Sequence, residues 1–197
     1  MKPARKLTCG ATSAVTVTAV TIAIASFAVQ ATAQTFEVSS ADIVAGKTID
    51  NKFVFNGFGC KGDNISPALA WKNAPAGTKS FAVLSHDPDA PTGGAGFWHW
   101  VVINIPATTM QLAQGAGAAD GKALPAGALQ INSDFGTADW GGPCPPVGDK
   151  PHRYNFTVYA LKVEKLELPP KATASLTGFM VNANSLGKAT FTGLYGR

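Results

Sequence analysis

"HRYNFTVYAL", residues 152–161, places an aromatic or aliphatic side chain at every second position from Tyr154 to Ala160. A period of two residues is typical of a β-strand that buries one face. Two further runs, KSFAVLSH at 79–86 and HWVVINI at 99–105, are rich in β-branched and aromatic residues and are bounded by Pro, Gly and Asp. Such runs also predict strands, so we expect the chain to be mainly β.

Shorter patterns add strand candidates and a helix. The helix is predicted at roughly 172–183, where Leu176, Phe179, Met180 and Ala183 recur at helical spacing, and we expect Phe179 and Met180 to pack against the sheets. Together the patterns predict two packed sheets with a peripheral helix near the C-terminus. The shorter strand candidates are TFEVSS (35–40), KFVFNGF (52–58), PALAW (67–71) and SLGKATFTGLYGR (185–197).

The N-terminus predicts export. The basic segment MKPARK is followed by a run rich in Thr, Ala and Val, and then by the small residues Ala31 and Ala33. This order is typical of a secretory signal peptide at 1–33, with cleavage expected after Ala33. An uncleaved membrane anchor is the alternative, because the run approaches the roughly 20 residues that span a bilayer. Residues 34–197 are then expected to form one domain, in the periplasm or outside the cell.

Removal of the signal peptide changes both the charge and the cysteine count. It takes away three cations and lowers the formal net charge from +4 to +1. A nearly neutral surface without a cluster of Lys and Arg gives no support for nucleic-acid binding. Cys60 and Cys144 remain. Two cysteines in an exported protein favour one disulfide, with two buried free thiols as the alternative.

The scarce ionisable residues gather at the ends of the predicted strands. Asp87 and Asp89 follow one strand, while His99 and His152 each begin another. Strict alternation would place His99 on the strand face opposite to Trp100. One such histidine is more often structural than functional, but three polar strand ends beside Pro- and Gly-rich loops predict a pocket.

Several chemistries fit these residues poorly. Ser85 and Ser133 lack the GxSxG context of a hydrolase nucleophile. A metal site formed by Asp87, His99 and His152 has no supporting HxH or HExxH spacing. A glycosidase pair would need an acid that opposes Asp87, and none is apparent. We therefore expect no catalytic residues, no metal and no cofactor.

A site for a small anion or phosphoryl group remains. Histidine and tyrosine side chains donate hydrogen bonds, and the glycines of GGP at 141–143 allow backbone N–H groups to approach a ligand. An aspartate in such a site would repel a dianion. The ligand is therefore expected to carry a proton or an amine as well, as phosphoethanolamine does.

DPDAP (87–91), HWVVINIP (99–106) and GGPCPP (141–146) with HRYNFTVYAL resemble the phosphatidylethanolamine-binding protein family, in its bacterial branch of Raf kinase inhibitor-like proteins. FNGFGCKGDNISPALAW (55–71) and TGLYGR (192–197) are similar to that branch too. The resemblance implies two antiparallel sheets with a shallow anion-binding pocket at one end. It also implies a Cys60–Cys144 disulfide that pins the 132–151 loop. The pocket residues it implies are Asp87, Asp89, Pro91, His99, Gly142, Pro143, His152 and Tyr154.

The expected function is therefore that of an exported, non-catalytic protein that binds a small anionic or phosphoryl ligand. The alternative is an inhibitor or interaction protein that acts on a partner enzyme such as a protease or a kinase. Contact with a membrane is expected only through lipid head groups.

Overall fold

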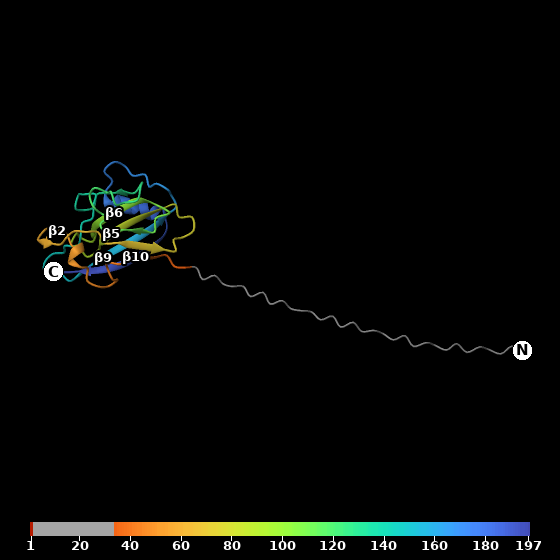
Figure 1. Cartoon of the computed structure of the whole chain (residues 1–197), viewed down its shortest axis with the longest axis horizontal. Helices are drawn as coiled ribbons and strands as arrows, with labels where there is room; N and C mark the ends of the chain where they lie inside the picture. Colours follow the sequence, from red (N-terminus) through yellow and green to blue (C-terminus); the bar gives the residue numbers. More distant parts are fainter. Residues whose placement is uncertain (2–33) are drawn as a thin grey trace. The chain divides into compact units, whose positions relative to one another are not determined.

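A five-stranded antiparallel sheet forms the centre of the molecule, in the order β10-β9-β5-β6-β8 (Figure 1). This computed structural model describes Met1 and residues 34–197, so the predicted signal peptide lies outside the described residues apart from Met1. The strand predicted at 152–161 is confirmed from end to end as β9. The strands of the sheet are β5 (Ser80–Asp87), β6 (Phe97–Pro106), β8 (Leu129–Gln130), β9 (His152–Leu161) and β10 (Ser185–Tyr195).

A three-stranded antiparallel sheet packs on one face of the central sheet. It consists of β1 (Glu37–Ser39), β4 (Leu69–Lys72) and β7 (Gln111–Leu112), in the order β1-β4-β7. Trp71 of β4 packs in one buried cluster with Phe81 of β5. The prediction of two packed antiparallel sheets is confirmed.

The helix α1 (Ala174–Ala183) covers the opposite face of the central sheet. Thr173 caps its N-terminus, because the Thr173 hydroxyl accepts a hydrogen bond from the Leu176 N–H at 3.1 Å. Among residues 34–197 no helix has the length and apolar character that crossing a bilayer requires.

The prediction that Phe179 and Met180 both pack against the sheet is wrong in part. Phe179 is 69% exposed, whereas Val181 is fully buried and Met180 is partly buried. The reason is steric: a Cβ at Gly178 would lie 3.4 Å from the Trp98 ring, so small residues let the helix approach the sheet closely. The remaining buried residues of the helix are Ala174, Thr177 and Gly178.

The strand expected at 52–58 is also wrong. The chain forms a 3-10 turn, η1 (Asn51–Phe53), followed by a short hairpin of β2 (Asn56–Gly57) and β3 (Cys60–Lys61). The Asp50 side chain caps the turn by accepting the Lys52 N–H at 2.9 Å. Such local bonds, together with the left-handed backbone of the hairpin loop, compete with an extended strand. We call residues 56–61 the β2–β3 hairpin.

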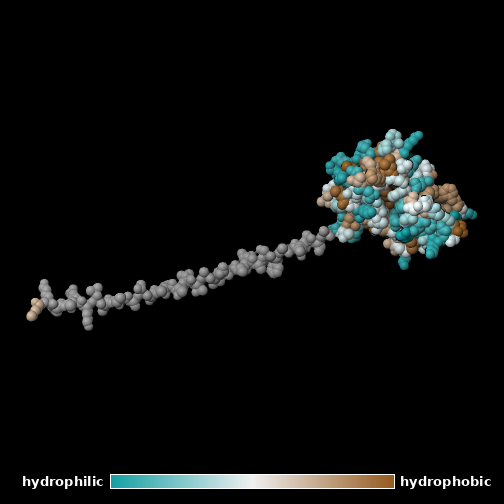
Figure 2. Space-filling model, turned by 180° about the vertical axis from the view of Figure 1, so that it is seen from behind, coloured by the Kyte–Doolittle hydropathy of each residue, from teal (hydrophilic) through white to brown (hydrophobic). Residues whose placement is uncertain are grey.

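The surface of the domain is mixed. Figure 2 shows one side, on which hydrophobic residues are interspersed among hydrophilic ones. This agrees with the small net charge of +1 that the sequence assigns to residues 34–197.

Candidate functional site

A small pocket opens where β5 ends and β6 and β9 begin. It has a volume of about 170 Å³. Five of the eight pocket residues predicted from the sequence line it: Asp87, Pro91, His99, His152 and Tyr154. A wider open groove of about 1090 Å³, between residues 127–136 and 165–174, contains none of the eight. The small pocket is therefore the candidate site, and ligand binding by its residues stays a prediction.

His99 reaches this pocket through an irregularity in strand pairing. Ser85 of β5 pairs with Trp100, but His86 pairs with Trp98, so that His99 is the extra residue of β6 between the two pairs. Such a β-bulge interrupts the alternation of faces. His99 lines the pocket while Trp100 lies in the core on the same side of the sheet. The expectation that His99 and Trp100 point to opposite faces is therefore wrong.

Asp87 and His152 form a buried pair at the polar end of the pocket. His152 Nδ1 donates to Asp87 Oδ2 at 2.7 Å, and the two side chains are only 4–5% exposed. The other oxygen of Asp87 accepts the backbone N–H groups of Asp89 and Ala90, at 2.8 and 3.1 Å. These bonds explain the DPDAP turn and leave the Asp87 carboxylate with partners on both oxygens.

The carboxylates around His152 favour its protonated form. Burial opposes its protonation, but the hydrogen bonds and charges of Asp87 and Asp149 outweigh burial and raise the pKa of His152. Its Nε2 lies 3.3 Å from Asp149 Oδ2, and the Asp149 side chain is 43% exposed. The contact with Asp149 is thus long and partly solvated, so this side of the imidazolium is the one that a ligand could reach.

His99 and Tyr154 supply a hydrogen-bond acceptor and a donor. His99 Nδ1 donates to the Gly141 carbonyl at 2.6 Å, which leaves Nε2 as the nitrogen with a lone pair. Burial lowers the pKa of His99 to about 4, so its ring is neutral at pH 7. Burial and the charge of Asp87 raise the pKa of Tyr154, so its hydroxyl stays protonated. Among the described residues that hydroxyl makes no hydrogen bond of normal geometry, and its contact with the Asp87 carboxylate contributes only weakly to the raised pKa.

Asp89 lies outside the pocket lining. Its carboxylate receives the fork of the Arg153 guanidinium, with Nε–Oδ2 and NH2–Oδ1 distances of 2.9 and 2.7 Å. The side-chain hydrogen bonds of Arg153 lower the pKa of Asp89 to about 2. Asp89 therefore ties the DPDAP turn to β9 rather than facing a ligand.

Gly142 and Pro143 also lie outside the lining. Gly142 N–H donates to Asn64 Oδ1 at 2.8 Å, and Gly141 N–H donates to the His99 carbonyl at 3.0 Å. The expectation that these N–H groups approach a ligand is therefore wrong. A Cβ at Gly142 would lie 2.1 Å from the Phe53 carbonyl oxygen, so the glycine serves close backbone packing.

Most of the remaining lining residues of the pocket are apolar, and we call these residues the apolar wall. They come from the β2–β3 hairpin, from β6 and from two loops. The sequence did not predict them, because an apolar side chain in a loop has no chemical feature that marks it as part of a site. The two prolines, Pro145 and Pro146, belong to the GGPCPP motif and follow the selected Gly142 and Pro143 after Cys144. The missed residues are Phe58, Ala90, Phe97, Phe135, Pro145 and Pro146.

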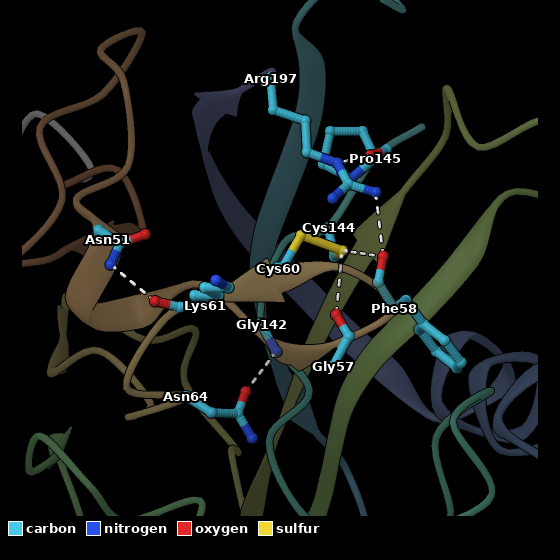
Figure 3. Close-up of a disulfide and its surroundings, with 10 residues drawn as sticks. All are labelled: Asn51, Gly57, Phe58, Cys60, Lys61, Asn64, Gly142, Cys144, Pro145 and Arg197. Atoms are coloured by element: carbon cyan, nitrogen blue, oxygen red, sulfur yellow. Dashed lines mark hydrogen bonds between the residues drawn. A yellow bond between two sulfur atoms is a disulfide. The ribbon is translucent and has the colours of Figure 1, made fainter. Parts of the chain in front are cut away.

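The Cys60–Cys144 disulfide joins the β2–β3 hairpin to this wall. The two sulfurs are 2.08 Å apart, which confirms the predicted bond, and Cys144 itself lines the pocket. Arg197 adds a second connection (Figure 3): its Nε donates to the Pro145 carbonyl at 2.7 Å and its NH2 to the Phe58 carbonyl at 3.2 Å. The hairpin and the wall are thus held together twice.

Comparison with known proteins identifies the family. Residues 39–196 match the family model described as phosphatidylethanolamine-binding protein. The chain belongs to the phosphatidylethanolamine-binding protein family. This confirms the resemblance inferred from the sequence, and it places the chain in a family of binding proteins.

Relatives within the phosphatidylethanolamine-binding protein family agree in fold. The Escherichia coli UPF0098 protein YbcL is 51% identical over 174 residues, which are 88% of this chain and 93% of YbcL. The crystal structure of YbcL, described as a new member of the mammalian family, matches with a TM-score of 0.80 over 82% of this chain and 98% of that one. A Mycobacterium tuberculosis relative named as a lipoprotein, LppC, is 39% identical over 139 residues, 70% of this chain and 63% of LppC.

Within residues 34–197, no group of three His, Cys, Asp or Glu side chains is arranged to hold a metal ion. What this pocket of the phosphatidylethanolamine-binding protein fold offers instead is two donors, His152 and Tyr154, and one acceptor, His99, beside apolar walls. Those are groups for holding a small polar molecule in a fixed orientation.

Proposed function

We propose that this chain is an exported, non-catalytic binding protein whose pocket takes a small phosphoryl group or a similar anion. The observation that carries the proposal is the Tyr154 hydroxyl, which is buried in the same pocket lining as His152 and makes no hydrogen bond of normal geometry among the described residues. An unpaired buried hydroxyl costs about 1–3 kcal/mol. An anionic ligand oxygen would accept its proton and remove that cost.

The polar groups indicate which form of the ligand binds. His152 and Tyr154 donate, whereas the lone pair on His99 Nε2 accepts. A ligand that fits all three carries negative oxygens and also one proton, as a singly protonated phosphate monoester does. Asp87 repels such an anion only weakly, because both oxygens of its carboxylate already accept hydrogen bonds from His152 and from two backbone amides.

The same groups argue against catalysis. The carboxylates that raise the pKa of His152 favour its protonated form, in which the ring has no lone pair with which to act as a general base. His99, with a pKa of about 4, is a weak base at neutral pH. Neither histidine contacts a serine, threonine or cysteine nucleophile among the hydrogen bonds of residues 34–197. Export is supported by the N-terminal pattern at 1–33 and by the name of the LppC relative.

A calorimetric titration of residues 34–197 with phosphoethanolamine and with inorganic phosphate at pH 7 tests the proposal. We expect saturable binding, weakened roughly tenfold or more by Tyr154→Phe because a hydrogen bond to a charged group is lost. His86→Ala is the matched control, since the His86 ring lies tilted against Trp98, with 4.2 Å between ring centroids, and does not line the pocket. The proposal is wrong if neither ligand produces saturable heat.

A further inference from the structure

The pocket has an apolar half that a phosphoryl group alone does not explain. Six of its lining residues are phenylalanines or prolines. These residues are Phe58, Pro91, Phe97, Phe135, Pro145 and Pro146. A site for inorganic phosphate needs donors but gains nothing from such a wall.

The three phenylalanine rings of the lining are connected through a fourth ring, that of Phe55, and together they form one aromatic layer. Phe135 stacks on Phe55 with 4.4 Å between ring centroids and meets Phe97 edge to face at 4.9 Å. Phe58 continues the layer, since its ring is stacked 5.5 Å from Phe55. Phe135 also meets the imidazole of His99 edge to face at 5.4 Å. The layer therefore begins at the polar end of the pocket and runs to its mouth.

Phe58 at the mouth is exposed and yet held in place. Its side chain is 77% exposed, although a large apolar residue usually gains by burial. Its backbone is left-handed, with φ of 51°, its carbonyl accepts from Arg197, and the neighbouring disulfide anchors the hairpin. Figure 3 shows the Phe58 ring projecting away from the disulfide. A fixed exposed ring offers a ligand apolar surface without a large ordering cost.

The size of the pocket limits the apolar part of a ligand. About 170 Å³ lies well below the roughly 300–1,000 Å³ of sites for drug-sized molecules. That volume leaves space for a single ring beside a phosphoryl group, whereas the rest of a larger ligand would have to extend out of the pocket.

Resting on the function proposed above, we infer that the preferred ligand of this pocket is an aryl phosphate, a phosphate monoester of a single aromatic ring. The phosphoryl oxygens lie against His152 and Tyr154, and the ring lies against the layer of Phe58 and Phe135. Flat rings are favoured because stacked or edge-to-face aromatic pairs gain more than the area they bury. Phe58 is thus the residue that sets ligand specificity.

Paired titrations of the same protein at pH 7 test this inference. Phenyl phosphate and methyl phosphate carry the same charged group and differ in the ring. We expect phenyl phosphate to bind roughly tenfold more tightly. Phe58→Ala should remove most of that difference, because it should weaken phenyl phosphate roughly tenfold and methyl phosphate much less, and the methyl phosphate binding that remains shows that the variant is folded. Phe179→Ala on α1, a phenylalanine that is 69% exposed, is the matched control and should change neither affinity.

The outcomes separate this inference from the function on which it rests. Equal affinities for the two esters, or equal weakening of both by Phe58→Ala, would overturn the aryl preference and leave the phosphoryl site standing. Absence of binding by either ester would overturn both.

Discussion

Burial and neighbouring carboxylates have different net effects on the two histidines of the pocket. Burial lowers the pKa of His99 to about 4, so its ring is neutral at pH 7, while the hydrogen bonds and charges of Asp87 and Asp149 outweigh burial and raise the pKa of His152. His99 therefore gains its proton only at a lower pH than His152 does.

His99 should make the protein sensitive to acid. Its folded pKa of about 4 lies below the usual 6.5, so the unfolded state binds a proton that the folded state refuses. The free energy of unfolding should therefore decrease as the pH falls from 6.5 to 4, by roughly 3 kcal/mol for this residue. Denaturant unfolding across this range measures the decrease. His99→Gln, which keeps a donor for Gly141, should lessen the slope, and an unchanged slope would contradict the assignment.

Asp87 should be a main cause of the raised pKa of His152. In Asp87→Asn the attraction is lost while burial remains, so the pKa of His152 should fall from above 6.5 to below it. An NMR titration of the imidazole resonances follows this directly. Asp120→Asn, which alters an exposed acid paired with Lys122, is the control and should leave the titration of His152 where it is. A His152 pKa that stays above 6.5 in Asp87→Asn would mean that Asp149 alone suffices.

At the level of elements, α1 shows how a helix can present its largest apolar residues to solvent. Val181→Ala should lower the free energy of unfolding by about 2 kcal/mol, because it removes fully buried methyl groups. Phe179→Ser should change it by less than about 0.5 kcal/mol, because that ring is mostly exposed. Guanidinium unfolding of both variants measures the contrast. A larger loss for Phe179→Ser than for Val181→Ala would show that the face has been assigned wrongly.

The strands could be predicted from the sequence because their β-branched and aromatic runs are long. β9 matches its prediction because a polar residue separates each pair of apolar ones between Tyr154 and Val158. The bulge at His99 could not be predicted, since Trp98, Trp100 and the residues that follow are apolar on both faces of a strand covered on both sides. A shift in register then leaves no trace in the pattern.

The sequence predicted most of the pocket residues whose side chains are polar and missed most of the apolar ones. The aspartate, histidines and tyrosine of the lining could be named because their side chains ionise or form hydrogen bonds. Phe58 and Phe135 could not, because their role depends on how two loops fold back on the sheet. Asp89 was chosen for its charge, but Arg153 takes up that charge.

For the molecule as a whole, the disulfide connects parts of the chain that are 84 residues apart. A double substitution, Cys60→Ser with Cys144→Ser, should lower the free energy of unfolding by about 4 kcal/mol, since the unfolded chain regains the freedom of a long loop. The midpoint of guanidinium unfolding measures the loss. Wild-type protein treated with a dithiol reductant should match the double variant, and the reductant should have no effect on that variant. A midpoint that reduction does not change would contradict the prediction.

The bulge in β6 makes the pocket depend on the length of a strand. Deleting Trp98 from β6 would allow a regular ladder with the end of β5, in which His99 pairs with His86 and its imidazole turns toward α1. Loops of the same domain tolerate insertions and deletions far better. In evolutionary terms, a single inserted residue separates an ordinary core strand from one that contributes a ligand-binding group. Natural variation in length should therefore be absent from β6 wherever the pocket is in use.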